Sequence, residues 1–151
     1  MRIIPATLEH LDLLTPLFVE YREFYGELPF PDSSRKFLAT RLQRKESVIY
    51  LALADDEDKL LGFCQLYPSY SSLSLKRVWI LNDIYVAKDA RRQLVADRLL
   101  QTAKKMAKET NAVRMRVATS RDNEVAQKVY ESIGFVEDEQ FKNYVLPINL
   151  D

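Results

Sequence analysis

The chain has 151 residues, of which 47% are apolar, and its 22 basic and 22 acidic side chains balance at neutral pH. This length suits a single domain over residues 1–151 with an adequate core, and the lack of a basic excess argues against a general nucleic-acid binder. The lone cysteine, Cys64, excludes an intrachain disulfide and favours a cytoplasmic location, and no apolar run approaches the roughly 20 residues that span a membrane.

Hydrophobic periodicity predicts a strand, two helices, three strands, and then alternating helices and strands. The first half should contain a strand at 2–5, helices at 8–25 and 32–44, and strands at 48–54, 59–67 and 77–87. Pro16 should kink or split the first helix, and Asp32 or Ser33 should cap the second. The second half should contain a helix at 92–110, a strand at 113–119, a helix after Asp122 that ends at Gly134, and strands at 135–137 and 141–148.

This order of elements predicts an α/β (α+β) fold with a mixed sheet and helices on both of its faces. Within it, a basic turn leads into the helix at 92–110, where unpaired amides at a helix N-terminus attract an anion. Candidate amides are those of Arg92, Leu94, Ala96 and Asp97, and Arg91 adds charge suited to a pyrophosphate. Taken alone, the turn favours an ordinary basic helix start with solvated arginines; the strand before it and the helix with Asn123 and Tyr130 after it favour the anion site.

The stretch from Trp79 to Phe135 joins this turn to a following helix that carries Asn123, Ala126, Tyr130 and Gly134. With the strand, the basic turn and this helix in that order along the chain, the stretch resembles the GCN5-related N-acetyltransferase (GNAT) superfamily. The resemblance implies a mostly antiparallel sheet of six to seven strands, splayed at its central strands. It also implies an enzyme, an acetyl-CoA-dependent N-acetyltransferase in which an amine attacks directly within a ternary complex.

The resemblance further implies cofactor contacts along the central strand, the turn and the last helix. These are Ile84, Tyr85, Val86, Arg91, Arg92, Gln93, Leu94, Val95, Ala96, Asp97, Asn123 and Tyr130. The Ile84 amide is implied to bind the acetyl carbonyl, and the Val86 region to pair with the pantetheine.

Leu94 stands where the family usually has glycine. A leucine can present its amide if its φ angle stays negative, with its side chain facing the core as the first member of the helix stripe. The alternative is a GNAT-fold binding or interaction module whose cofactor affinity was weakened or lost with the glycine.

Tyr130 is implied to be the acid that protonates the leaving coenzyme A thiolate, although its spacing also fits a core aromatic on an amphipathic helix. Two roles are open for Asp83. It either acts on the substrate, by binding its ammonium group or relaying its proton, or it is a buried structural acid. Asn123 fits helix capping and cofactor contact equally well. His10 is expected at the surface, Cys64 in the core, and no metal site is expected.

Residues 21–25 and 62–68, with Trp79 to Asp83, resemble the yeast histone-like and D-amino-acid N-acetyltransferases within the superfamily. That likeness implies an acceptor side formed by Tyr21, Tyr25, Tyr67, Asn82 and Asp83. A small amine or amino acid is the expected substrate, ahead of a protein lysine, with no nucleic-acid or membrane partner. A homodimer through residues 141–148 is compatible with the family.

Overall fold

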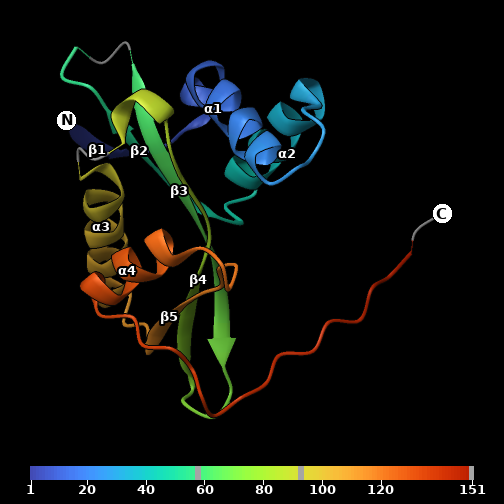
Figure 1. The fold of residues 1–151 in the computed structure, drawn as a ribbon, viewed down its shortest axis with the longest axis vertical. Helices are drawn as coiled ribbons and strands as arrows, with labels where there is room; N and C mark the ends of the chain where they lie inside the picture. Colours follow the sequence, from blue (N-terminus) through green and yellow to red (C-terminus); the bar gives the residue numbers. More distant parts are fainter. Residues whose placement is uncertain (57–58, 92–93, 150–151) are drawn as a thin grey trace.

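A computed structural model describes residues 1–56, 59–91 and 94–149, and across these ranges a single sheet lies between two pairs of helices (Figure 1). The strands are β1 Arg2–Pro5, β2 Val48–Leu53, β3 Leu60–Ser71, β4 Lys76–Val86 and β5 Arg114–Val117. The helices are α1 Leu11–Phe24, α2 Pro31–Gln43, α3 Val95–Glu109 and α4 Glu124–Ile133, with short 3-10 turns at Leu8–His10 and Lys88–Ala90. None of the helices in these ranges is long and apolar enough to cross a bilayer.

The sheet has the order β1-β2-β3-β4-β5, with antiparallel neighbours up to β4 and a parallel β4–β5 pair connected through α3. This confirms the expected α/β architecture with a mixed, mostly antiparallel sheet. The pairing of β5 with β4 ends at Leu81, whereas β4 continues to Val86. The last residues of β4 therefore have no neighbouring strand on that side among the described residues.

The predicted number of strands is wrong, because the described residues form a sheet of five strands and not six or seven. Residues 135–137 and 141–148, predicted as strands, have no strand pairing, and all of them except the partly buried Phe135 are exposed to solvent. A strand is stabilised by a neighbour that completes its hydrogen bonds and covers one face. In a single chain, this C-terminal segment meets no such neighbour among the described residues.

Two helix starts also differ from prediction. Helix α2 begins at Pro31 with Phe30 as the capping residue, so neither Asp32 nor Ser33 is the cap, and proline at the first position already has a suitable φ. Helix α4 is capped by Asn123 and not by Asp122. Helix α1 runs through Pro16 as one element and is not split there.

Each face of the sheet packs on one pair of helices. One core lies under α1 and α2 and includes Leu14, Leu38, Leu51 and Phe63. The other lies under α3 and α4 and is centred on buried residues such as Leu66, Leu81, Leu99 and Leu100. In Figure 1 the two helix pairs accordingly lie on opposite sides of β3 and β4.

A bulge in β4 changes which side chains face which core. Gln65 of β3 pairs with Asp83, but the next residue, Leu66, pairs with Leu81, so Asn82 is an extra residue without a partner in the register. Before the bulge, Leu81 packs in the α3/α4 core, and after it Tyr85 packs in the α1/α2 core. The extra residue therefore turns Asp83 toward α1.

We predict that Gly62→Ala destabilises the fold, because a methyl group at Gly62 would lie 2.9 Å from both the Tyr85 carbonyl oxygen and Val95 Cγ1. Relieving that contact requires β4 or the start of α3 to move, and we expect a loss of about 2 kcal/mol in the free energy of unfolding. Urea denaturation followed by circular dichroism measures this loss.

Gly26→Ala is the control, because nothing lies within 4 Å of the added methyl group and only the positive φ of 81° opposes it. We expect about 1 kcal/mol for that variant. Wild-type stability in Gly62→Ala would show that α3 does not approach β3 as closely as this.

Candidate active site

Asp83 is the centre of a buried polar cluster between β4, β3 and α1. Its Oδ1 accepts hydrogen bonds from the Tyr21 hydroxyl at 2.7 Å and from Asn82 Nδ2 at 3.1 Å, and its Oδ2 accepts one from Gln65 Nε2 at 2.8 Å. The residue is 7% exposed. Each of these partners is a donor, and this arrangement suits an ionised carboxylate. Asp83 is thus a buried, hydrogen-bonded acid that contacts Tyr21 of α1.

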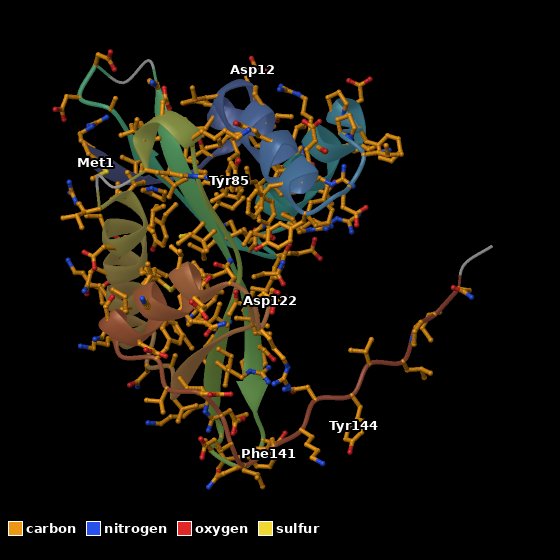
Figure 2. All side chains as sticks on the ribbon, viewed as in Figure 1. Met1, Asp12, Tyr85, Asp122, Phe141 and Tyr144 are labelled. Carbon is orange, nitrogen blue, oxygen red and sulfur yellow. The ribbon has the colours of Figure 1, made fainter. Side chains whose placement is uncertain are left out.

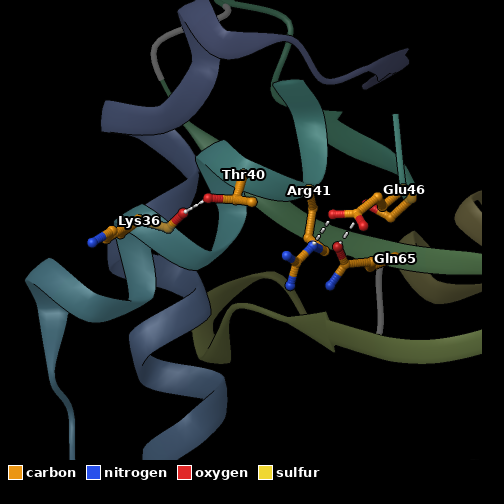
Figure 3. A network of polar contacts seen from close by, with 6 residues as sticks. Lys36, Thr40, Arg41, Glu46 and Gln65 are labelled. Atoms are coloured by element: carbon orange, nitrogen blue, oxygen red, sulfur yellow. Dashed lines mark hydrogen bonds and ion pairs between the residues drawn. The ribbon is translucent and has the colours of Figure 1, made fainter. Parts of the chain in front are cut away.

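Gln65 extends this cluster toward the loop before β2. Its Oε1 accepts a hydrogen bond from the Ser47 hydroxyl at 2.8 Å, and its side chain is fully buried. Figure 3 shows Gln65 beside the ion pair in which Arg41 Nε lies 3.1 Å from Glu46 Oε1. Gln65 was not predicted as a site residue from the sequence. The signal that could have found it was one amide in an otherwise apolar strand, since a buried amide requires partners.

Aromatic rings from α1 and the strands line the region around Asp83. The Tyr21 ring lies 5.3 Å from Tyr25, 5.7 Å from Phe63 and 5.8 Å from Tyr85, measured between centroids. Burial and the neighbouring Asp83 raise the pKa of Tyr21, and the same two causes raise the pKa of Tyr67 to about 12. These phenols therefore keep their protons at neutral pH and act as donors around the carboxylate.

Tyr130 reaches the same region from α4. Burial raises its pKa to about 12, and the Tyr25 hydroxyl adds to the shift. Tyr130 in turn contributes to the raised pKa of Tyr21, which places the three phenols within electrostatic reach of one another. Its ring packs edge-on against Phe135 at 5.7 Å. The structure therefore brings together Tyr21, Tyr25, Tyr67, Asp83 and Tyr130, which lie far apart in the sequence.

The end of β4 presents an unpaired backbone edge. The Ala87 amide donates to the Leu61 carbonyl of β3 at 2.8 Å. Because backbone groups alternate sides along a strand, those of Tyr85 also point to β3, whereas those of Ile84 and Val86 point to the side without a strand. An extended ligand can therefore pair with this edge in the way that an additional strand would.

The basic turn lies at the end of this edge. The Arg91 guanidinium lies over the rings of Phe24 and Tyr85, at 5.9 and 5.6 Å from their centroids, and Arg91 Nε is 3.4 Å from the Val86 carbonyl. Arg91 therefore faces the α1 side of the turn. Arg92 and Gln93, also expected to contact the cofactor, lie outside the described residues. The ring of Tyr85 is buried and packs against α1, and its backbone groups point to β3, so neither reaches the open edge of β4.

Leu94 contradicts both expectations made for it. Its φ is 61° and its ψ is 24°, which is the left-handed region, and its side chain is 72% exposed and does not face the core. The backbone thus adopts the conformation for which glycine is favoured, with a leucine in place. Beyond it, the amides of Val95, Ala96 and Asp97 occupy the first turn of α3, where they lack intrahelical acceptors.

Asn123 precedes α4 and accepts a hydrogen bond from the Ala126 amide at 3.1 Å through its side-chain oxygen. This confirms the capping role. The cap uses only the oxygen of this side chain and not its nitrogen, so capping does not exclude a cofactor contact.

Three comparisons relate this site to known proteins. Residues 12–135 match the sequence profile described as the Acetyltransferase (GNAT) family. The "Uncharacterized N-acetyltransferase YhfO" of Bacillus subtilis (strain 168) is 38% identical over 98% of each chain. A crystal structure of "a probable acetyltransferase" is 80% identical and overlays with a TM-score of 0.96 over 100% of both chains. Aminoglycoside N-acetyltransferase AAC(6')-Iy, in complex with CoA, is 22% identical with a TM-score of 0.79 over 97% of this chain and 95% of its own, and this shows likeness of fold.

The narrower resemblance to yeast histone-like and D-amino-acid acetyltransferases is not supported. The curated relative that covers nearly the whole chain is bacterial, and its name assigns no substrate. The segments at 21–25 and 62–68 that suggested the yeast subgroup contribute Tyr21, Tyr25, Phe63 and Gln65 to the cluster around Asp83.

We predict that Leu94→Gly stabilises the protein by about 1 kcal/mol, because glycine adopts a positive φ without the steric cost that a β-carbon imposes. Leu94→Ala is the control: it removes most of the exposed side chain but keeps the β-carbon, so its stability should stay within about 0.5 kcal/mol of wild type. Thermal unfolding by calorimetry measures both. An equal gain in both variants would show that the exposed leucine side chain, and not the backbone, is the source of the cost.

We predict that Asp83→Asn lowers the free energy of unfolding by about 3 kcal/mol, because an amide presents donors to partners that are donors already. Tyr21→Phe removes one donor and keeps the ring, so it should cost about 1 kcal/mol. Urea denaturation of the two single variants and the double variant measures their coupling. Additive losses would contradict the direct Tyr21–Asp83 contact.

Proposed function

Because the chain belongs to the acetyltransferase (GNAT) family, we propose that it transfers an acetyl group to the primary amine of a small molecule or amino acid. It is an N-acetyltransferase, and acetyl-CoA, which the family uses, supplies the acetyl group. The observation that carries the choice of acceptor is the buried carboxylate of Asp83, surrounded by phenols, beside the unpaired end of β4. The amine attacks the thioester directly in a ternary complex.

The open edge of β4 and the start of α3 fit this cofactor. The Ile84 amide is available to hold the acetyl carbonyl, and an amide aimed at the developing oxyanion contributes a few kcal/mol to catalysis. Val86 would pair with the pantetheine, and the amides of Val95, Ala96 and Asp97 would hold the pyrophosphate together with Arg91. Leu94 supports this assignment, since it holds a left-handed backbone despite its β-carbon. The turn geometry is therefore maintained at a cost, which argues against a decayed binding module.

Asp83 and the phenols would receive the acceptor amine. An ammonium group is attracted by the negative charge of Asp83 and by the aromatic faces of Tyr21 and Tyr25. The amine must lose a proton before it attacks, and for an amine with a pKa of about 10.4 this costs roughly 4.6 kcal/mol at pH 7. We assign two roles to Asp83: it orients the Tyr21 hydroxyl, and it relays this proton. Tyr67 and Asn82 complete the acceptor side.

Tyr130 would donate a hydrogen bond to the departing thiolate. With a pKa of about 12 it remains protonated at any physiological pH. Complete transfer of its proton to a thiolate whose parent thiol has a pKa of about 8.5 is uphill by about 5 kcal/mol. Tyr130 therefore stabilises the thiolate as the carbon–sulfur bond breaks. The attacking nitrogen loses a proton as the neutral amide forms, and this proton balances the one that the thiolate gains as the products separate. Asn123 caps the N-terminus of α4 by accepting a hydrogen bond from the Ala126 amide. From that position it would hold the cofactor near Tyr130.

Protein lysine ranks behind small amines, because the acceptor side is a partly buried cluster of rings and not an open groove with charges for a peptide. An enzyme that uses acetyl-CoA works where acetyl-CoA is made, so we propose the cytoplasm as its location. We also propose that the enzyme acts as a homodimer.

Tyr130→Phe tests the mechanism. We expect kcat to fall by about 100-fold or more, the usual range for loss of one hydrogen bond to a developing negative charge, while the dissociation constant for acetyl-CoA measured by calorimetry changes little. Release of free thiol, followed colorimetrically with a panel of primary amines and a lysine peptide, measures turnover. Tyr70→Phe is the control, because Tyr70 is an exposed tyrosine at the far end of β3. Unchanged turnover in Tyr130→Phe would exclude Tyr130 from the chemical step.

A further inference from the structure

Arg41, near the end of α2, carries a guanidinium group that is largely covered by the protein but only partly used by it. Its side chain is 22% exposed, and its Nε lies 3.1 Å from Glu46 Oε1 (Figure 3). Neither of its two Nη groups donates a hydrogen bond to a residue that the structure describes. A guanidinium carries five donors in one plane, so it can bind a second carboxylate while its Nε is already paired. Arg41 therefore retains unused donors at a partly buried position.

A path of polar contacts connects Arg41 to the acceptor side. Glu46, the partner of Arg41, is followed in the chain by Ser47, whose hydroxyl donates a hydrogen bond to Gln65 Oε1 at 2.8 Å. The other end of the same amide, Gln65 Nε2, donates to Asp83 Oδ2 at 2.8 Å. Arg41 and Asp83 are thus the two ends of one polar path, with a positive charge at one end and a negative charge at the other.

A series of aromatic rings makes the same connection on the helix side. The Arg41 guanidinium lies 4.4 Å from the centroid of the Phe37 ring. Phe37 stacks on Phe18 at 6.3 Å, and the Phe18 ring lies 6.0 Å from that of Tyr21. Figure 2 shows Tyr85, whose ring also packs on Tyr21, on the side of the sheet that α1 covers. Arg41 therefore borders the same layer of rings that forms the acceptor side.

Tyr67 marks the place where the two opposite charges act together. It follows Gln65 by two residues on β3, so both side chains lie on the face of the sheet that α1 and α2 cover. Burial and then the negative charge of Asp83 raise the pKa of Tyr67, whereas the positive charge of Arg41 opposes this rise. The Tyr67 hydroxyl is therefore within electrostatic reach of both groups, and a ligand beside it would meet both charges.

We propose that the acceptor is a free α-amino acid, whose ammonium group lies at Asp83 and Tyr21 and whose carboxylate binds the two Nη groups of Arg41. This inference rests on the proposed function and narrows it from primary amines in general to zwitterions. A planar guanidinium binds a carboxylate through two parallel hydrogen bonds, and Glu46 holds the plane of Arg41 through Nε. An amine without a carboxylate would leave these donors unpaired, so the site discriminates against it.

Two bisubstrate compounds test the carboxylate contact by binding alone. In each compound an acetyl bridge joins the sulfur of coenzyme A to a nitrogen atom, which belongs to glycine in one and to glycinamide in the other. Because glycine has no side chain, the two compounds differ only at the carboxylate. We expect calorimetry to show that the protein binds the glycine compound about 30-fold more tightly, which is the usual effect of a hydrogen bond to a charged group.

Arg41→Gln should reduce this ratio of affinities to about threefold or less, because a neutral amide does not replace the charge of the guanidinium. Arg44→Gln is the matched control: Arg44 is an exposed arginine at the end of the same helix, and its loss should leave the ratio at the wild-type value. Equal affinity of the wild-type protein for the two compounds would overturn the proposal. Equal weakening of both compounds by Arg41→Gln would also overturn it, since Arg41 would then have a structural role only.

Turnover of free acceptors distinguishes failure of this inference from failure of the proposed function. We compare kcat/KM for glycine, leucine and phenylalanine with kcat/KM for their amides, and we expect the ratio to fall about 30-fold in Arg41→Gln. The intrinsic reactivity of each acceptor is the same with both proteins, so it cancels. Acetylation of amines without any effect of the carboxylate would overturn the choice of acceptor and leave the reaction in place. If neither bisubstrate compound binds, the acetyl-CoA site is contradicted, and both the proposed function and this inference fail.

Discussion

The bulge in β4 determines on which face of the sheet Asp83 lies. If β4 kept the same residues but had no bulge, regular alternation would place Asp83 on the same face as Trp79 and Leu81, inside the apolar core under α3 and α4. An ionised carboxylate there would lack donors, and its burial would cost several kcal/mol. The bulge places it instead under α1, where Tyr21 and Gln65 supply hydrogen bonds. The same shift directs the backbone of Ile84 and Val86 to the edge that β5 leaves open.

Regular elements were predictable because their signals are local and repeated. The helical stripe of α3, with Leu99, Ala103 and Ala107 buried, follows directly from its apolar spacing. The left-handed end of α4 at Gly134 is likewise as predicted. Helix starts were less predictable, because several residues near Pro31 and Asn123 can cap a helix and the choice among them depends on contacts elsewhere.

The groups of the site were harder to predict for a physical reason. Gln65 carries no motif, and its importance arises only when β3 and β4 pair and bring it to Asp83. The conformation of Leu94 was predicted wrongly because an aliphatic residue at a helix start usually has negative φ. The next residue, Val95, lies so close to Gly62 that a methyl group there would be 2.9 Å from Val95 Cγ1, and this contact between distant residues is not visible in the sequence. The C-terminal strands were predicted from composition, but composition does not specify whether their pairing partner lies in the same chain.

Helix α4 and the segment that follows it are physically connected at Tyr130. The segment begins at Phe135, whose amide donates to the Tyr130 carbonyl at 3.0 Å and whose ring packs on Tyr130. Helix α4 is thinly anchored, since Ile133 is its one fully buried residue among those described. The Phe135 contacts therefore help to fix the position of Tyr130 relative to the open edge of β4. Because hydrogen-bond catalysis depends on sub-ångström placement of the donor, Phe135 would contribute to the proposed role of Tyr130 without contact with the reacting atoms.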